Sequence, residues 1–365
     1  MQNHFAVIIV GAGPAGLQCA RTLRGSGKSV LVIDRKDVIG PKPCGGGLTH
    51  QDEPFGIPGS ITRPAETQVI RVGKHEITVH LRHVLRSITR LDLGQFLLKE
   101  VQNAPNITVL TGTKVTEIRP DCVVTTKGIF SFTSLVGADG TDSLVRTFLK
   151  LPKKITLGFT FDLPVHTEKV LWYFNPRKLK TAYLWSFPKK GNSATSLPFR
   201  ERPSEGGVRQ GTLSKQEDSK FAITNVGGYY DPEEIPFEDV LLEFKAFMAA
   251  EGLSFDLSQL KGAPLGILYK GVEFGSIFLA GEAAGMTEAL TGEGIAFALT
   301  SGQEVARRIL DPTYPMPELE RILVLKRRRE HLLTILRAHA RMQPSLMRLG
   351  AHLLQLKRFQ EFFGA

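Results

Sequence analysis

The chain has 365 residues, 42% of them hydrophobic and 22% charged, which is ordinary globular composition with enough material for two associated domains or one large mixed domain. No run of about 18 uninterrupted apolar residues occurs, so no membrane-spanning helix is predicted. Cys19, Cys44 and Cys122 have neither metal-ligand spacing nor a disulfide framework, so we expect a cytoplasmic protein without a metal site. The formal charge of +10 favours a phosphate-bearing partner, either nucleic acid or an anionic membrane.

Residues 5–34 predict a strand, a glycine turn, a helix and a second strand. Residues 5–10 are a short apolar run, and Pro14 suits the first turn of a helix, where its missing N–H costs nothing. Residues 29–34 predict the second strand. The Gly- and Pro-rich residues 36–50 are expected to form a loop.

The rest of the chain alternates helical and strand-like stretches, and the residue pattern changes at about residue 155. From there to residue 230, alternating and aromatic stretches predict a separate sheet. The polar, Gly- and Ser-rich residues 200–220 are expected to be a surface insertion with little structure. Further helices are expected at residues 91–104, 235–250 and 293–310 and in the tail, broken at Pro344. Further strands are expected at residues 108–112, 133–140, 156–163, 169–174, 182–187 and 276–280.

The glycine turn has the spacing of a dinucleotide site. Residues 11–16 read Gly-Ala-Gly-Pro-Ala-Gly between a strand and a helix, which is the context that this pattern requires. Gly11 permits the tight turn, Gly13 lets the backbone approach a pyrophosphate, and Gly16 allows close helix–strand packing. Asp34, at the end of the second strand, can accept hydrogen bonds from an adenosine ribose. The alternative is a helix–strand turn that binds nothing.

Two later glycine-bearing segments favour FAD over NAD. Residues 137–140 read Gly-Ala-Asp-Gly and residues 281–285 read Gly-Glu-Ala-Ala-Gly, each after an expected strand. A ligand gripped from three distant segments suits FAD better than a small nicotinamide module. Glu282 could hold ribityl hydroxyls, and the helix that starts at Gly292 could face the flavin pyrimidine with its N-terminus. Taken singly, each segment could also be a plain turn.

Two further motifs carry a family resemblance. Residues 42–48 read Lys-Pro-Cys-Gly-Gly-Gly-Leu, and residues 183–188 read Tyr-Leu-Trp-Ser-Phe-Pro. Together with the three glycine segments, they make the chain similar to the geranylgeranyl reductase family of FAD-dependent oxidoreductases, which has the para-hydroxybenzoate hydroxylase fold. The resemblance spans residues 5 to about 310.

The resemblance implies an α/β fold in which a Rossmann-like FAD-binding domain is interleaved with a mostly antiparallel β-sheet substrate domain and followed by a C-terminal helical tail. The FAD-binding domain is expected to comprise residues 1–72, 86–150 and 264–310. The substrate domain is expected to comprise residues 73–85 and 151–263, and the basic helical segment residues 311–365.

The resemblance also assigns roles to residues. Arg90 is carried over on a loose match, because the family's Arg-x-x-x-Asp helix start has a shorter spacing here. Family members show a glycine- and valine-rich strand after the position of Pro188, whereas residues 189–200 read differently, which leaves the substrate open. The residues expected to hold FAD are Gly11, Gly13, Pro14, Ala15, Gly16, Asp34, Arg35, Cys44, Gly45, Gly46, Arg90, Val115, Asp139, Gly140, Gly281, Glu282, Gly292, Gly294 and Ile295.

Cys44, Tyr183 and Trp185 are the expected catalytic residues. Tyr183, Trp185 and Phe187 alternate along a strand, so their rings share one face and are expected to line the substrate cavity. Ordinary sheet packing would explain the same spacing. Cys44 lies among glycines that allow a ring system to approach closely, and it could relay a proton or gate flavin movement. Alternatively, Cys44 is a small packing residue.

The function that these features predict is an FAD-dependent reductase that saturates carbon–carbon double bonds of isoprenoid, geranylgeranyl-type chains of a lipid or quinone. Hydride would pass from N5 of the reduced flavin, and the electron donor would be NADPH, a ferredoxin or a quinol. One alternative is an aromatic hydroxylase or halogenase on the same fold, although no lysine of the halogenase type can be assigned. A second alternative is a non-catalytic flavoprotein that senses redox state or transfers electrons.

Residues 316–365 carry ten Lys or Arg against four acids, which is more than half of the positive excess. Their apolar residues lie among the basic ones, a pattern typical of a helix in a membrane interface. We therefore expect peripheral contact with an anionic membrane surface, the alternative being helices packed on the body with a solvated basic face. No nucleic-acid module is recognised, so nucleic acid is not expected as a partner.

Overall fold

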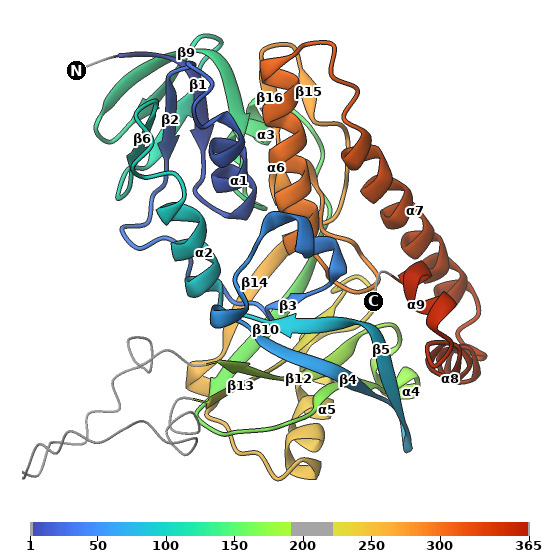
Figure 1. Ribbon diagram of the computed structural model, residues 1–365. Coiled ribbons are helices and arrows are strands. Elements are labelled where there is room, and N and C mark those ends of the chain that lie inside the picture. Colours follow the sequence, from blue (N-terminus) through green and yellow to red (C-terminus); the bar gives the residue numbers. More distant parts are fainter. Residues whose placement is uncertain (1–2, 191–221, 364–365) are drawn as a thin grey trace, which may run out of the picture.

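The computed structural model describes residues 3–190 and 222–363, so the insertion expected at residues 200–220 lies outside the described residues. Two eight-stranded sheets, A and B, form the frame. Sheet A and its helices make the upper part of the molecule in Figure 1, and sheet B makes the lower part. The chain passes between the two sheets several times, as the interleaved domains of the prediction require.

Sheet A has a parallel centre with antiparallel additions. Strand β1 (His4–Val10) pairs in parallel with β2 (Val30–Ile33) on one side and β9 (Gly128–Gly137) on the other. Its residues 7–10 are apolar and buried, as expected for a central parallel strand covered on both faces. The parallel set continues with β6 (Ile107–Leu110) and β16 (Ile277–Leu279), and the antiparallel additions are β7 (Val115–Ile118), β8 (Cys122–Thr125) and β15 (Glu273–Phe274).

Helices α1 (Pro14–Leu23) and α6 (Ile295–Leu310) pack side by side against sheet A (Figure 1). They approach so closely that a Cβ on Gly302 would lie 2.1 Å from the carbonyl oxygen of Ala15. The glycine therefore lets two helices from opposite ends of the chain touch through their backbones. Shorter helices flank this pair, namely α2 (Arg90–Lys99) and α3 (Leu144–Phe148).

Sheet B is mostly antiparallel, as predicted, with one parallel pair between β11 (Val170–Phe174) and β4 (Arg63–Val72). Helix α5 (Phe237–Ala250) covers one face, where Phe244 packs on Phe159 and Phe161. The other face carries aromatic rings toward sheet A. The order of strands is β14 (Lys261–Gly266), β10 (Ile155–Leu163), β13 (Ala222–Tyr230), β12 (Tyr183–Lys190), β11 (Val170–Phe174), β4 (Arg63–Val72), β5 (His75–Ser87) and β3 (Gly47–Leu48), with α4 (Pro176–Leu179) after β11.

At β3 and β4, and at the ends of β5 and β14, the sheets divide the chain differently from the predicted domain boundaries. Residues 63–72 were expected in the FAD-binding domain, but their strand β4 belongs to sheet B. Strands β4 and β5 form a hairpin around Gly73, whose φ of 61° suits the tight turn. Two strands joined by so short a turn pair with each other, so both enter the same sheet.

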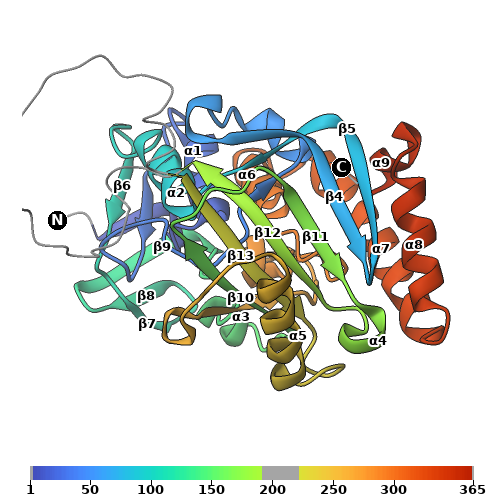
Figure 2. The same ribbon diagram turned by 90° about the horizontal axis from the view of Figure 1, so that it is seen from below.

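Three helices complete the chain: α7 (Pro317–Ala338), α8 (Gln343–Leu353) and α9 (Lys357–Phe363). Helix α7 runs down the side of the molecule, and α8 and α9 lie beside β4 and β5 (Figures 1 and 2). The helical tail is broken at residues 339–342, and Pro344 lies in the first turn of α8, where proline is tolerated. Within the described ranges, no helix has the length and apolarity needed to cross a bilayer.

Arg146 connects several loops through hydrogen bonds to their backbone carbonyls. Its side chain is buried and donates to the carbonyl oxygens of Pro152 (3.1 Å), Ala283 (2.9 Å) and Leu268 (2.8 Å). These acceptors lie on three separate segments, so one guanidinium connects them and satisfies the buried Ala283 carbonyl.

We expect Arg146→Met to lower the free energy of unfolding by about 3 kcal/mol, because the buried Ala283 carbonyl and two part-buried carbonyls lose a charged donor. Urea unfolding followed by circular dichroism measures this change. Arg119→Met is the control, since Arg119 is exposed and pairs only with Glu117, and surface changes of this kind stay within about 0.5 kcal/mol. Equal losses for both variants would contradict the role assigned to Arg146.

Candidate active site

A cavity of about 1370 Å³ runs between the two sheets. Its wall is formed in turn by the glycine turn before α1, the Cys44 loop, the aromatic face of sheet B and helices α7 to α9. Pockets for a single small ligand usually measure about 300–1000 Å³, so this one has room for a large cofactor together with a second molecule.

The three glycines of the first motif have different duties. A Cβ on Gly11 would lie 2.3 Å from the Ala138 carbonyl oxygen, and one on Gly16 would lie 1.9 Å from the Gly11 carbonyl oxygen. Gly11 and Gly16 therefore permit backbone contacts. A Cβ on Gly13 would meet no atom within 4 Å, and Gly13 lines the cavity at the N-terminus of α1. This position is where the predicted pyrophosphate would lie against free N–H groups.

Asp34 braces this turn while facing the cavity. One carboxylate oxygen accepts the Ala12 N–H at 2.7 Å and the other accepts the Lys36 N–H at 2.8 Å. Each oxygen keeps a lone pair for a further donor, such as a ribose hydroxyl. Arg35 and Val115 line the same end of the cavity.

Several buried polar atoms on the cavity wall have no hydrogen-bond partner among the described residues, and two of them lie on residues predicted to hold FAD. One is Oδ1 of Asp139, whose Oδ2 caps α3 by accepting the Leu144 N–H at 2.7 Å. The other is Nε of Arg90, the first residue of α2. Burial raises the pKa of the Asp139 carboxyl. Since buried polar atoms are nearly always hydrogen-bonded, both atoms fit a polar ligand in the cavity.

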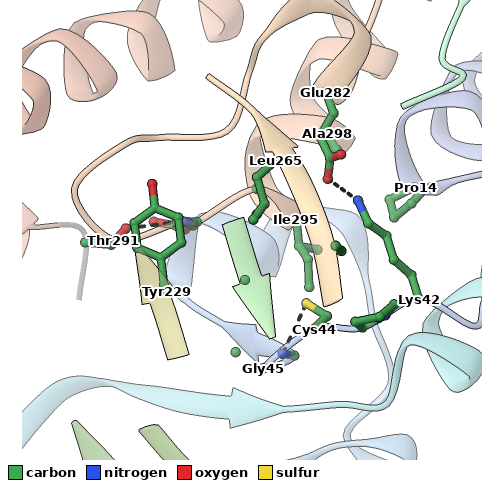
Figure 3. A pocket seen from close by; sticks show the side chains of 18 of the residues that line it. Pro14, Lys42, Cys44, Gly45, Tyr229, Leu265, Glu282, Thr291, Ile295 and Ala298 are labelled. Atoms are coloured by element: carbon green, nitrogen blue, oxygen red, sulfur yellow. Dashed lines mark hydrogen bonds and ion pairs between the residues drawn. The ribbon is translucent and has the colours of Figure 1, made fainter. Parts of the chain in front are cut away.

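Lys42 and Glu282 form an ion pair across the cavity, shown in Figure 3. The Thr141 hydroxyl also donates to Glu282, at 2.6 Å. Burial opposes ionisation of Glu282, but the charge and hydrogen bond of Lys42 and the bond from Thr141 outweigh it and lower the pKa. Glu282 is thus an ionised acceptor, and Lys42, which the sequence analysis did not select, brings the cysteine loop to it.

The cysteine loop is pressed against the aromatic face. Gly46 has a φ of 73°, and a Cβ there would lie 2.0 Å from the Ile88 carbonyl oxygen, so only glycine fits. A Cβ on Gly45 would touch the rings of Phe187 and Trp185 at 3.3 and 3.4 Å. The Gly46 N–H donates to the Cys44 sulfur at 3.3 Å.

Lys189 holds the same loop from behind. Its ammonium is buried and donates to the Cys44 carbonyl oxygen at 2.9 Å, with Asp162 3.9 Å away. Burial lowers the pKa of Lys189. Sequence reasoning missed this residue because its partner lies 145 positions earlier in the chain.

Tyr183, Trp185 and Phe187 face the cavity together, as predicted from their alternation, whereas Leu184 faces α5. The ring centroids of the three are 6.0 and 6.1 Å apart in succession. The Tyr183 hydroxyl donates to the Thr291 carbonyl oxygen, and burial raises its pKa well above the ordinary value. The Trp185 ring N–H donates to Asn225 at 2.8 Å. Their polar atoms are occupied, so these residues offer the cavity mainly their apolar rings.

The glycine- and valine-rich strand that the sequence analysis did not find after Pro188 is present as β13. It pairs with β12 and places Gly227 opposite Trp185. A Cβ on Gly227 would lie 2.5 Å from the Trp185 ring, so this glycine makes room for the indole. Sequence reasoning missed the strand because residues 191–221, which lie outside the described part, separate it from β12.

A cluster of carboxyl groups lies beside the loop that begins α6. The Thr49 hydroxyl donates to Glu293 at 3.0 Å, and the Thr49 N–H donates to Asp52 at 2.9 Å. Arg329 of α7 is buried and pairs with Glu293 at 2.6 Å and with Glu288 at 3.4 Å. Burial, and then the charge of Glu293, raise the pKa of Asp52 well above its usual value. The predicted Gly292, Gly294 and Ile295 flank Glu293, which was passed over.

The predicted site residues come together around one cavity. Every one of them except Gly16 lines the cavity. Gly16 instead packs the turn, as the motif predicts. Among the described residues, no group of three or more His, Cys, Asp or Glu is placed to hold a metal ion.

The chain is similar in sequence and fold to known proteins. The NAD(P)-binding Rossmann-like domain family matches residues 9–49. An uncharacterized protein of Methanosarcina barkeri is 28% identical over 84% of this chain and 75% of its own length. The digeranylgeranylglycerophospholipid reductase of Methanocella arvoryzae is 25% identical over 83% of this chain and 76% of its own length.

Among solved structures, a geranylgeranyl bacteriochlorophyll reductase-like protein of Thermoplasma acidophilum superposes with a TM-score of 0.75 at 18% identity, over 98% of this chain and 92% of that one. The chain thus has the fold of FAD-dependent oxidoreductases that geranylgeranyl reductases and para-hydroxybenzoate hydroxylase share. Within that class, the chain is related to geranylgeranyl reductases at low identity.

Gly13→Val should fold normally but lose FAD, because a Cβ at this position meets no protein atom within 4 Å and the added side chain fills the space in front of α1. The flavin absorbance of the purified protein measures occupancy, and the thermal midpoint of the FAD-free form checks the fold. Gly59→Val is the control, since a Cβ there also meets nothing within 4 Å and Gly59 does not line the cavity. A fully yellow Gly13→Val protein would place the pyrophosphate elsewhere.

Asp52→Asn should change how stability depends on pH. Because the pKa of Asp52 is raised in the folded state, the folded protein holds an extra proton between the unfolded value, about 3.9, and the folded one. The parent therefore loses stability as pH rises through that window, by about 1.4 kcal/mol per unit of pKa difference, and the variant does not.

Urea unfolding at pH 4, 6 and 8 tests this difference. The advantage of Asp52→Asn over the parent should grow with pH, whereas Asp121→Asn, at an exposed position, should run parallel to the parent. Parallel curves for all three proteins would show that Asp52 titrates normally.

Proposed function

We propose that the protein is an FAD-dependent reductase that saturates carbon–carbon double bonds in isoprenoid, geranylgeranyl-type chains of a lipid or quinone. One observation carries the proposal. The apolar chamber of Tyr183, Trp185 and Phe187 lies in the same cavity as the nucleotide-binding turn, and the Cys44 loop touches both regions through Lys42 and Gly45. The relative named digeranylgeranylglycerophospholipid reductase adds support.

The residues on the wall fit FAD as the cofactor. Gly13 and the start of α1 would hold the pyrophosphate, and Asp34 the adenosine ribose. The unpartnered atoms of Asp139 and Arg90 and the ionised Glu282 supply polar contacts further along the cavity. When bound and reduced, FAD supplies the hydride that such a reduction needs.

The side chains of the chamber prepare the alkene. An isolated prenyl double bond is a poor electrophile, so it must be held in place while hydride reaches one carbon and a proton reaches the other. The rings of Tyr183, Trp185 and Phe187 position the chain and exclude water.

Cys44 is the proton donor in this scheme. Its sulfur accepts the Gly46 N–H, which leaves the thiol proton free, and Lys189 fixes the loop through the Cys44 carbonyl. Transfer of that proton completes the conversion of C=C to CH–CH. The resulting thiolate keeps the Gly46 N–H bond and regains a proton from water.

The two other functions make different demands on the site. A halogenase requires a lysine that is free to face the tunnel to the substrate, whereas Lys42 of the cavity lining is paired with Glu282 and the buried Lys189 lies behind the cysteine loop. A non-catalytic electron carrier has no use for an apolar chamber of this size. The electron donor is proposed to be NADPH, a ferredoxin or a quinol.

The test is anaerobic reduction of the holoprotein with dithionite, followed by addition of a geranylgeranyl lipid. We expect the flavin to reoxidise and the lipid to gain two hydrogens per double bond by mass spectrometry. Reoxidation only by oxygen, with a hydroxylated or halogenated aromatic product, would support the hydroxylase or halogenase. Absence of turnover with any lipid or aromatic would support the electron carrier.

In the same assay, Cys44→Ala should slow alkene reduction by about 100-fold, the lower range for loss of a general acid, while keeping its FAD. Cys122→Ala is the control, because Cys122 is half-buried in β8 away from the cavity. Turnover of Cys44→Ala equal to that of the parent would reduce Cys44 to a packing residue.

A further inference from the structure

We propose that the ends of α7, α8 and α9 form a docking surface for an anionic bilayer, and that the cavity opens onto this surface so that a lipid chain enters from the membrane. The docking surface comprises the exposed side chains between residues 335 and 358. This inference rests on the proposed function, because it concerns how the substrate of that site reaches it.

One mouth of the cavity lies between α7 and α8. Ile335 of α7 and Leu349 of α8 line the cavity, yet 38% and 55% of their surfaces are exposed. A side chain that both faces a cavity and meets solvent marks an opening. The wall behind this opening is apolar and includes Leu336, Leu346, Met347, Leu353 and Leu354. A hydrocarbon chain could pass this mouth without leaving an apolar surface.

Further large apolar side chains are exposed on the same stretch of the chain. Met342 is 54% exposed and Leu356 is 47% exposed. With Ile335 and Leu349 they make four exposed apolar residues within 22 positions of the chain. Such a group is costly in water unless another apolar phase covers it, and the region is beside β4 and β5 at the edge of the molecule (Figure 2).

The stretch of chain that carries these apolar residues contributes positive charges. Residues 331–360 contain five Lys or Arg and no Asp or Glu. Arg337 pairs with Asp231 and Glu234, whereas Arg341, Lys357 and Arg358 are exposed and make no ion pair with other described residues. Exposed cations beside apolar side chains are the composition of an interfacial helix on anionic lipids.

The same charges argue against a second copy as the occupant. A symmetric dimer through this face would place each set of cations against its own image, and like charges in an interface are unfavourable. An anionic bilayer satisfies both the cations and the apolar side chains at once.

The experiment is co-sedimentation of the FAD-loaded full chain with sucrose-filled vesicles. We expect binding to phosphatidylcholine with one quarter phosphatidylglycerol, weaker binding as NaCl rises, and little binding to phosphatidylcholine alone. Arg341→Gln with Lys357→Gln should weaken binding about 25-fold, since each cation near an anionic surface contributes about fivefold. Leu356→Asp should also weaken it.

Two matched controls have the same chemistry on other helices. Lys99→Gln with Lys245→Gln removes two exposed cations from α2 and α5, and Leu242→Asp alters an exposed leucine of α5. Both should bind vesicles as the parent does. Equal binding to neutral vesicles, equal losses in the controls, or no binding would overturn the proposal. A dimer in analytical ultracentrifugation that Leu349→Asp dissociates would do so as well, in favour of a second copy.

The outcome for docking is separable from that for the reductase, because vesicle binding needs no turnover. Salt-sensitive binding lost in the α8–α9 variants would support the docking surface even if no lipid were reduced. Reduction of detergent-dispersed lipid by a protein that ignores anionic vesicles would sustain the reductase and reject the docking surface.

Discussion

The cavity depends on backbone contacts around the first turn of α1 that leave no space for side chains. A Cβ on Gly11 would overlap the Ala138 carbonyl, and one on Gly302 would overlap the Ala15 carbonyl. A Cβ on Gly281, whose φ is 61°, would lie 2.9 Å from the Ala15 Cβ, so this glycine lets a third segment approach α1. Because these segments are far apart in sequence, the glycines bring the polar groups that follow them, Asp139 and Glu282, onto one wall.

Buried charges then fix the loops that cross between the sheets. Lys42 links the cysteine loop to Glu282 through an ion pair. Lys189 links the same loop to sheet B by donating to the Cys44 carbonyl oxygen. Arg329 of α7 ties the C-terminal helices to Glu293 at the start of α6. A buried charge without its partner is strongly destabilising, so each pair favours one arrangement of its loop. The C-terminal helices are therefore part of the cavity wall and not a separate appendage.

The aromatic chamber gains its shape from glycine as much as from its rings. Because Gly227 has no Cβ, the indole of Trp185 fits against it. Gly45 likewise allows the cysteine loop to pack on Phe187. The hydroxyls of Tyr183 and Tyr229 donate to the carbonyls of Thr291 and Ala289, in the loop before α6. Sheet B thereby supports the loop on the sheet A side, which couples the substrate chamber to the nucleotide end.

The sequence by itself determined the βαβ unit, the duties of its glycines and the shared face of Tyr183, Trp185 and Phe187, because each follows from local spacing. It also indicated which glycine-bearing segments meet, through their order and flanking strands. Only the tertiary structure decided that β4 belongs to sheet B, that β13 resumes the interrupted sheet, and that Lys42, Lys189 and Arg329 hold the loops. Those features depend on partners far apart in the chain, and periodicity carries no information about which distant residues pair. The opening between Ile335 and Leu349 has the same origin, since a helix pattern shows which side is apolar but not what that side encloses.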